Sequence, residues 1–433
     1  MKTEIFANAR ALVRRRWLLA AGLSVAMFPA WAQFQVQVSG VGLTQLPVAV
    51  VPFRGEADSP VKLSTVILAD LERSGRFKSI STAGQTLDET QRPDLPLWRQ
   101  RNADAVAAGS VSRLADGRFD VRFRLWDTVR GQDLGGQSYA VVTGDLRLAA
   151  HRIADAIHLK LTGERGVFST RITYVTKNAA QYSLWVADAD GENGQVALAS
   201  PEPIISPTWS PNGEQVAYVS FESRKPVVYV HDVSSGKRRL LANFRGSNSA
   251  PAWAPDGKTV ALTLSRDGGS QIFVMDATGG QPRRLTQSQG IDTEPVFTPD
   301  GKSIYFVSDR GGEPQIYRMP ASGGNAERVT FTGNYNISPA LSPDGRWMAY
   351  ISRSGTAFKL QLMELASGTS QSLTDTTVDE SPSFAPDSRL IVYATQQQGR
   401  EALMTTTLDG KIKARLAGQA GEIREPSWGP FQN

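Results

Sequence analysis

A sequence motif recurs along the second half of the chain at an almost constant spacing. It consists of Pro, any residue, a bulky apolar residue and a small residue, followed in most copies by Pro-Asp-Gly or a close variant. The leading prolines are 44, 44, 44, 43 and 44 residues apart, at Pro207, Pro251, Pro295, Pro339, Pro382 and Pro426. A period of this length predicts a β-propeller, because one four-stranded blade cannot bury both faces without neighbours.

Each repeat predicts four short strands separated by turn residues. In the repeat around Pro251, the expected strands cover residues 250–255, 259–265, 271–277 and 282–287, with Asp256-Gly257 as the first turn. The second strand of every repeat is almost continuously apolar, which is typical of a strand covered on both faces. We therefore assign these strands to the core.

The two ends of the repeat region complete each other. The last copy, EPSWGPFQN, supplies only a first strand, whereas residues 171–199 supply three strands with no first strand before them. We predict six blades, one of which combines the C-terminal strand as its innermost strand with residues 171–199 as its outer three. This closure leaves few free sheet edges.

The first 32 residues have the pattern of a cleaved signal peptide. Arg14, Arg15 and Arg16 precede an apolar run, and Ala30-Trp31-Ala32 fits the small-x-small cleavage rule. The run is too short for a comfortable membrane span. The arginines also loosely match a twin-arginine signal, but the general secretory route is favoured. We expect export to an extracytoplasmic space.

Charge and composition exclude several functions. The formal net charge is +5, but five basic residues and one acidic residue lie in the first 32, so the remaining chain is nearly neutral. A nearly neutral chain lacks the excess of basic residues that nonspecific binding of nucleic acid requires. The chain has no cysteine, which excludes disulfides, thiol catalysis and thiolate metal sites.

Residues 46–165 predict a small α/β domain, connected by a short link to a propeller over residues 170–433. Residues 48–53 form a buried strand, and a helix is expected to open at Ser59 with Pro60 as its first residue and to close at Gly75. Asp116-Gly117 joins two further strands. A second helix ends at Gly163, with one apolar stripe formed by Leu146, Ile153, Ile157 and Leu161.

Catalysis finds little support in the sequence, and we expect no enzyme and no cofactor. His151 and His158 are seven residues apart, too far for a metal pair at i and i+4, and His231 is isolated. No G-x-S-x-G motif is present. The Asp-Gly and Gly-Gly pairs are explained by hairpin turns.

Several segments together carry a family resemblance. The VVPF strand, LADLERSGRF, the junction LTGERGVFSTRITYV, the repeats, and the closing KARL and PSWGP resemble the TolB family of the Tol–Pal system. The repeat alone is also similar to propellers attached to prolyl-oligopeptidase-type peptidases. The resemblance implies a non-enzymatic protein of the Gram-negative periplasm. Such a protein would bind the lipoprotein Pal through its propeller and TolA through its mature N-terminus, supporting outer-membrane integrity and cell division.

The segment 33–45 alternates apolar residues and glutamines before two glycines, a pattern typical of a strand at a sheet edge. One interpretation makes it the first strand of the α/β domain. The other makes it a mobile strand lent to a partner by β-augmentation. It occupies the place of the family's TolA-binding segment, although it has no acidic residue. The resemblance thus implies a TolA site at Phe34, Gln35, Val36, Gln37, Val38, Ser39 and Gly40.

The residue before each leading proline is one position repeated six times, and it is expected to form a ring at one mouth of the propeller channel. These residues are Ser206, Ala250, Glu294, Ser338, Ser381 and Glu425. The resemblance places the Pal site on this mouth, and we add Ser247, Thr293 and Glu380 to it. Loop arginines form a basic outer zone, which ordinary solvation also explains: Arg224, Arg266, Arg310, Arg353 and Arg400.

Two classes of function remain open. The favoured class is a protein-binding adaptor, and the alternative is a periplasmic propeller that binds glycans or small ligands. Convergent aromatic side chains and carboxylates in the funnel would favour the alternative. Small serine and alanine side chains with two glutamates favour a protein loop.

Overall fold

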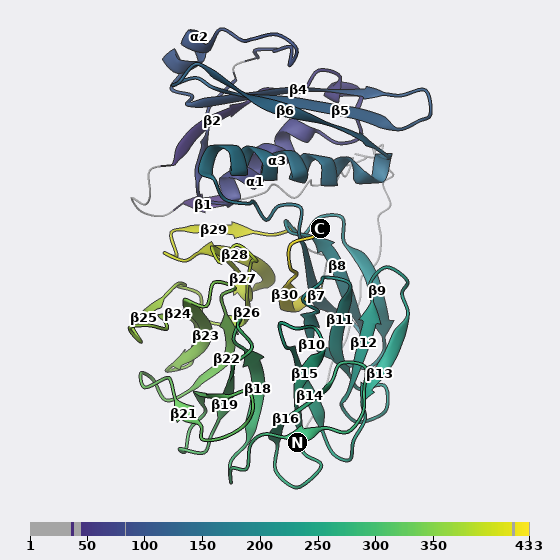
Figure 1. Cartoon of the computed structure of the whole chain (residues 1–433), viewed down its shortest axis with the longest axis vertical. Coiled ribbons are helices and arrows are strands. Elements are labelled where there is room, and N and C mark those ends of the chain that lie inside the picture. The colour runs from purple at the N-terminus through teal and green to yellow at the C-terminus, as the bar shows by residue number, and fades with distance from the viewer. Residues whose placement is uncertain (1–35, 39–44, 83, 418–420, 433) are drawn as a thin grey trace, which may run out of the picture. The chain divides into compact units, whose positions relative to one another are not determined.

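The computed structural model describes residues 36–38, 45–82, 84–417 and 421–432, all of which belong to one compact unit. Seven β-sheets form in this part of the chain. Figure 1 shows them with the α/β domain in purple and blue and the propeller in teal to yellow. The predicted signal peptide, residues 1–32, lies outside the described residues and stays a prediction.

The N-terminal domain is built on one mixed sheet with the strand order β3-β2-β4-β5-β6. The pairs β2–β3 and β2–β4 are parallel, whereas β4–β5 and β5–β6 are antiparallel. The bounds of its elements are β2 Leu46–Val50, η1 Glu56–Asp58, α1 Leu63–Arg73, β3 Phe77–Ser79, α2 Leu95–Gln100, β4 Ala105–Arg113, β5 Phe119–Asp127, β6 Gln132–Val141, η2 Thr143–Asp145 and α3 Leu146–Thr162.

Helix α1 begins later than predicted. Ser59 ends the short helix η1, and Lys62 is the N-cap of α1, so Ser59 and Pro60 do not open it. The reason lies in Glu56, whose carboxylate accepts hydrogen bonds from the Ser64 backbone N–H at 3.1 Å and hydroxyl at 2.6 Å. An acidic side chain thus satisfies the free amide of the first turn. The chain leaves the helix at Gly75 with φ of 75°, as predicted.

Helix α3 agrees with its prediction. Its apolar stripe packs inward, with Leu146, Ile153 and Ile157 fully buried, and Gly163 closes it with φ of 77°. The stripe belongs to the same buried cluster as the inner face of the sheet and of α1. None of the helices described here is long and apolar enough to cross a membrane.

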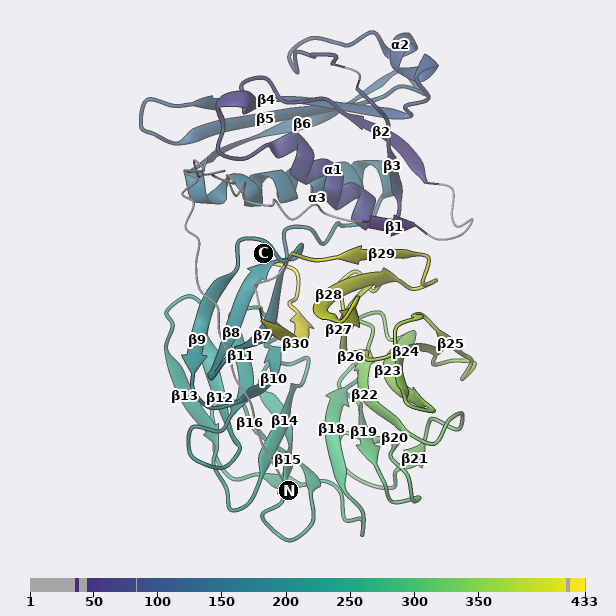
Figure 2. The same cartoon turned by 180° about the vertical axis from the view of Figure 1, so that it is seen from behind.

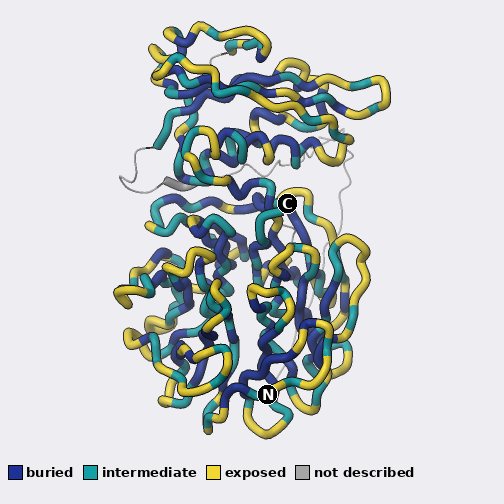
Figure 3. Tube along the Cα trace, viewed as in Figure 1, coloured by how far each residue is buried: buried dark blue, intermediate teal, exposed yellow. Residues whose placement is uncertain are grey.

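The propeller has six blades, as predicted. The inner strands are β30 Glu422–Trp428, β10 Ile204–Trp209, β14 Asn248–Trp253, β18 Asp292–Phe297, β22 Asn336–Leu341 and β26 Glu380–Phe384. The second strands are β7 Arg171–Asn178, β11 Gln215–Ser220, β15 Thr259–Leu264, β19 Ser303–Ser308, β23 Trp347–Ser354 and β27 Leu390–Gln397. The second strands are largely buried, as their apolar sequences predict, and Figure 3 shows this pattern in dark blue.

In each blade the third and fourth strands together contain fewer residues than the first two, because the fourth strand is the shortest. The third strands are β8 Gln181–Asp188, β12 Val227–Asp232, β16 Gln271–Asp276, β20 Gln315–Pro320, β24 Ala357–Glu364 and β28 Arg400–Thr407. The fourth strands are β9 Gln195–Ser200, β13 Arg238–Ala242, β17 Arg283–Arg284, β21 Glu327–Arg328, β25 Ser370–Ser372 and β29 Ile412–Arg415. The blade that ends with β29 gains a fifth strand, β1 Val36–Val38.

The ring closes through the C-terminal strand. β30 pairs with β7 in the sheet β30-β7-β8-β9, which confirms the predicted closure, and Figure 2 shows the yellow strand beside teal β7. Trp428 anchors the strand, since its indole N–H donates to the Thr170 hydroxyl at 2.8 Å. On the neighbouring blade, the Trp209 indole N–H donates to the Ser427 carbonyl at 3.2 Å.

Deleting residues 425–433 removes most of this inner strand, including Trp428. We expect a sharp fall in Tm and strong binding of a hydrophobic dye, because two blades then expose apolar faces to water. Deletion of 432–433 is the matched control, since its main loss is the hydrogen bond from Arg165 to the Gln432 carbonyl. Equal melting of the long deletion and the intact protein, measured by calorimetry, would contradict closure through β30.

Candidate functional site

The six predicted ring residues share one unusual backbone conformation. All six have a left-handed φ between 46° and 54° although none is glycine. In every blade the ladder between the inner and second strands is interrupted at this residue and the following proline. Proline has no N–H for a ladder, so each inner strand forms a β-bulge there. The ring residues therefore lie inside the inner strands at a bulge, and not in the loops between strands.

Two ring glutamates bind the bulge of the next blade. The Glu294 carboxylate accepts a hydrogen bond from the Ser338 backbone N–H at 2.6 Å, and Glu425 accepts one from the Ser206 N–H. An amide freed by the bulge is thereby satisfied across a blade boundary. These glutamates thus have a structural role in addition to any contact with a partner.

The carboxylates of the ring are held in an environment that disfavours charge. The pKa of Glu425 is raised to about 7, mainly by burial and also by the nearby Glu380 and Glu294, although the hydrogen bond from the Ser206 N–H lowers it. Burial also raises the pKa of Glu294 and of Glu380. The centre of the mouth therefore carries less negative charge near neutral pH than three free glutamates would.

A further set of polar residues, missed by the sequence reasoning, fixes the loops around the ring. They lie two residues before the ring position in four blades and are at most 2% exposed: Asn248, Asp292, Asn336 and Asp379. Asn248 donates to the carbonyls of Phe244 and Gly246, and Asp292 accepts from Arg310 at 2.9 Å. Recurrence at the repeat period was the signal that could have identified them.

The remaining predicted mouth residues lie next to the ring. Ser247 precedes β14, where its N–H donates to the Ser265 hydroxyl at 2.8 Å. Thr293 is in β18 and receives a hydrogen bond of 3.3 Å from the Thr263 hydroxyl. Glu380 is the first residue of β26. The structure therefore gathers all nine predicted residues at the same end of the inner strands.

The outer zone of this mouth combines exposed apolar side chains with arginines. Ile291, Phe331 and Val378 lie in the loops that lead into inner strands and are 53%, 75% and 43% exposed. Arg353 lies over the Tyr335 ring at 4.6 Å, and Arg266 over the Phe244 ring at 5.4 Å. Aromatic and apolar groups with arginine at the edge are typical of protein interfaces.

The predicted N-terminal strand pairs with the propeller. Val36, Gln37 and Val38 form β1, which runs antiparallel to β29 at the outer edge of its blade, opposite Ala414, Lys413 and Ile412. The strand is not part of the α/β sheet, so the interpretation as a first strand of that domain is wrong. Phe34, Gln35, Ser39 and Gly40 lie outside the described residues.

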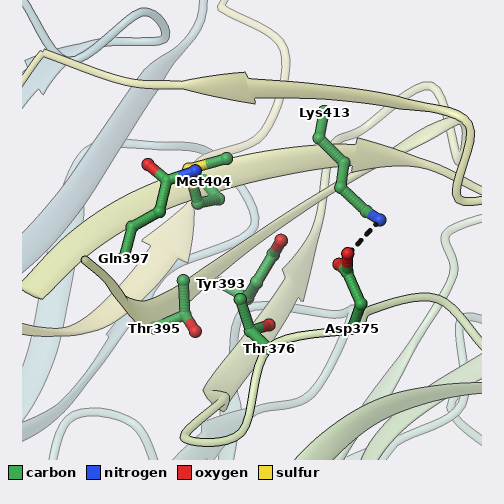
Figure 4. Close-up of a pocket in the computed structure, with 7 residues that line it drawn as sticks. All are labelled: Asp375, Thr376, Tyr393, Thr395, Gln397, Met404 and Lys413. Atoms are coloured by element: carbon green, nitrogen blue, oxygen red, sulfur yellow. Dashed lines mark hydrogen bonds and ion pairs between the residues drawn. The ribbon is translucent and has the colours of Figure 1, made fainter. Parts of the chain in front are cut away.

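A small polar pocket of about 200 Å³ lies in the same blade. Figure 4 shows the residues that line it, with an ion pair of 3.3 Å between Lys413 and Asp375. The lining residues are Asp375, Thr376, Tyr393, Thr395, Gln397, Met404 and Lys413. Pockets for drug-sized ligands usually measure about 300–1,000 Å³ and are mostly apolar. This pocket therefore gives little support to a small-ligand site.

The three histidines do not form a catalytic site. His158 lies between the rings of Phe77 and Phe168, and His231 is buried on β12. His151 lies close to Asp70 and Asp190, and these three residues have donor atoms near enough for a metal ion. Arg73 and Arg147 already pair with the same two carboxylates, so we assign no metal site there.

Comparison with known proteins agrees with this architecture. The TolB amino-terminal domain family matches residues 34–134, and the TolB beta propeller domain family matches residues 158–432. The Tol-Pal system protein TolB of Albidiferax ferrireducens is 79% identical over 97% of this chain and 99% of its own length. That of Dechloromonas aromatica is 61% identical over 98% and 99%. The crystal structure of TolB from Acinetobacter baumannii is 38% identical, covers 92% of this chain and all of its own, and has a TM-score of 0.83.

The fold and the mouth define a six-bladed β-propeller with an appended α/β domain. The inner-strand ring and the closing strand β30 lie within the region that the propeller family matches, and strands β2 to β5 of the N-terminal sheet lie within the region that the amino-terminal domain family matches. The chain belongs to the TolB family of the Tol–Pal system.

Titration of Glu425 is expected to make stability depend on pH. Its pKa is raised, so its contribution is fully present below pH about 4.5 and is lost as pH rises through about 7. Glu425→Gln keeps an oxygen for the Ser206 N–H but cannot ionise. As the pH rises from 5 to 8, we expect the unfolding free energy of this variant to increase by roughly 1–3 kcal/mol relative to that of the native protein.

Urea unfolding at the two pH values measures this gain. Glu327→Gln, at the exposed position of strand β21, is the control. Its unfolding free energy should differ from that of the native protein by the same amount at both pH values. If the unfolding free energies of Glu425→Gln and the native protein differ by the same amount at both pH values, then folding does not raise the pKa of Glu425.

Proposed function

We propose that the protein is a periplasmic adaptor of the Tol–Pal complex that binds Pal at the propeller mouth and TolA through its mature N-terminus. In this role it supports outer-membrane integrity and cell division. Export by the cleaved signal peptide, residues 1–32, brings it to the periplasm. Membership of the TolB family supports the assignment to this system, and the partners follow from the family resemblance.

The ring of bulges carries the proposal for the mouth. Four of its six members are serine or alanine, so the centre leaves room for an inserted partner segment: Ser206, Ala250, Ser338 and Ser381. The exposed Ile291 and Phe331 offer apolar contacts around it. Fully desolvated centres surrounded by such contacts dominate the binding energy of protein interfaces.

Ala250→Gln tests the inserted segment. We expect at least tenfold weaker binding of Pal, about 1.4 kcal/mol, because the side chain fills the space that the segment would occupy. The fold should survive, since Glu294 and Glu425 show that a side chain of this size fits the same left-handed φ. Glu294→Lys is a poorer test, because it removes the acceptor of the Ser338 N–H.

Calorimetry with the soluble domain of Pal measures this effect. Asn193→Gln is the matched control, since Asn193 has φ of 54° and is exposed in the β8–β9 turn, at the opposite end of the blade from the mouth. Equal affinities of both variants and the native protein would place the Pal site away from the ring.

The position of β1 supports the second part of the proposal. In the part of the chain that the structure describes, three residues pair β1 with β29, and a ladder this short at a sheet edge can exchange for another. The same backbone groups could pair with an edge of TolA. We therefore infer an exchange in which β1 leaves β29 and joins its partner.

Deleting residues 33–38 is expected to abolish TolA binding while changing Tm only slightly, because β1 contributes one short ladder to the propeller. Surface plasmon resonance with TolA and a thermal melt measure the two effects. The matched control replaces Gln35 and Gln37 with Thr, which preserves the backbone pairing and the strand propensity. A large loss of thermal stability would assign β1 a structural role instead.

Exchange of β1 also permits coupling between the partners. If Pal changes the affinity for TolA, then TolA must change the affinity for Pal by the same factor. Measuring TolA affinity with and without saturating Pal decides this point, and equal values exclude coupling.

A further inference from the structure

A second polar cluster lies where helices α1 and α3 meet the blade that β30 closes. It joins three carboxylates, two guanidinium groups and one imidazole: Asp70, Asp188, Asp190, Arg73, Arg147 and His151. We call it the interdomain ion cluster. His151 is 0% exposed, and Asp70 and Arg73 are each 1% exposed, so the contacts are shielded from water.

On the helical side, His151 of α3 and Arg73 of α1 share one carboxylate. His151 Nδ1 lies 2.6 Å from Asp70 Oδ2, and Arg73 Nη2 lies 2.8 Å from Asp70 Oδ1. Both oxygens of Asp70 are therefore used. This arrangement fixes the imidazole with Nδ1 toward α1 and its Nε2 edge toward the propeller.

On the propeller side, two carboxylates face that edge. His151 Nε2 lies 3.6 Å from Asp188 Oδ2 and 3.9 Å from Asp190 Oδ2. Arg147 bonds Asp190 and lies 3.6 Å from Asp188. Asp188 ends strand β8 and Asp190 lies in the next turn. His151 thus lies between a carboxylate of the α/β domain and two carboxylates of the propeller.

Charge balance indicates the protonation state of the imidazole. Three carboxylates face two guanidinium groups, which leaves one negative charge without a partner if His151 is neutral. A buried charge without a partner is strongly destabilising. With an imidazolium these six charges cancel. The Nδ1 N–H then donates to Asp70, and the Nε2 edge carries positive charge close to Asp188 and Asp190 without a hydrogen bond to either.

We propose that His151 is an imidazolium at physiological pH and that it clamps the α/β domain to the blade that β30 closes. The clamp continues toward the N-terminal strand, because the Ala417 N–H donates to the Asp190 carbonyl at 3.0 Å, two residues after β29. Strand β29 is the strand that pairs with β1. Loosening the clamp is therefore expected to loosen the edge on which β1 lies.

The electrostatics agree with this geometry. Burial alone would lower the pKa of His151, but Asp70, Asp188 and Asp190 raise it to about 10. The charged groups that face the imidazole or pair with its carboxylates are Asp70 and Arg73 from α1, Arg147 from α3, Asp188 from β8 and Asp190 from the following turn. Outside this set, Glu192 interacts with Arg147 and Asp155 interacts with Asp70. Stability from a raised histidine pKa is fully present below pH about 6.5 and is lost as pH rises toward 10.

The proposal can be tested in the unmodified protein by NMR, because the chain has only three histidines. Burial lowers the pKa of His158 and of His231, so their ring signals should titrate below pH 6.5. We expect the His151 ring signal to keep imidazolium shifts up to at least pH 9. His158→Gln and His231→Gln assign the signals by elimination. Titration of His151 below pH 7 would overturn the proposal, as would a shift of its signal by one equivalent of Zn²⁺.

Hydrogen exchange tests the clamp itself. In Asp190→Asn at pH 7, we expect at least tenfold faster amide exchange in 188–191 and 412–417 than in the native protein. Exchange in the distant strand β19 should be unchanged, and Asn212→Asp in another turn of the propeller is the control. Unchanged exchange at both segments would show that the cluster does not hold the domains together.

Discussion

The pairing of β30 with β7 is the constraint on which the rest of the structure depends. It joins the last strand of the chain to the first strand after the α/β domain, so the ring cannot close until nearly the whole chain is present. Closure brings Glu425 next to Ser206 and completes the series of six inner strands. It also places Asp188 and Asp190, two strands away in the same blade, against helix α3. The mouth and the interdomain ion cluster thus depend on one ladder.

Each inner strand has a strained backbone at its bulge, and hydrogen bonds between neighbouring blades offset part of the cost. A non-glycine residue in the left-handed region costs about 1–2 kcal/mol, and the ring contains six such residues. Hydrogen bonds from bulge amides to Glu294 and Glu425 offset part of this cost at two blade boundaries. Strain of this kind persists only where the surrounding structure fixes it, and it is often found at functional sites. The repeated bulge therefore holds the ring residues at a defined orientation around the axis.

Sequence periodicity predicted the features that repeat. The spacing of the prolines predicts six blades, the closing strand and the six equivalent ring positions, because each copy must adopt the same local structure. The left-handed φ at Ala250 and its equivalents was not predicted, since serine, alanine and glutamate have no strong preference for that region. The anchoring role of Asp292 and Asn336 was missed, although it follows the same period.

Features that occur once could not be read from the sequence. The Glu56 carboxylate that opens α1 lies eight residues before Ser64, outside any standard capping spacing. The alternation in 33–45 indicated a strand, but not which edge it would occupy. Asp70, His151 and Asp190 are far apart along the chain: packing of α1 against α3 brings Asp70 to His151, and the contact between domains adds Asp190. Long-range packing decided all three.

The blade β26–β29 carries both proposed binding surfaces on one sheet. Ser381 lies on its inner strand at the mouth, and β1 pairs with its outer edge strand β29. A sheet transmits displacement through its ladders, because a shift of register in one strand must be matched in the next. If a partner at the mouth moves β26, the shortest path to β1 therefore crosses only two intervening strands, β27 and β28. In our proposal the interdomain ion cluster opposes such movement from the other side, since Ala417, two residues after β29, is hydrogen-bonded to the turn of Asp190. If both proposals hold, release of β1 depends on the balance between a partner bound at the mouth and the charge on His151.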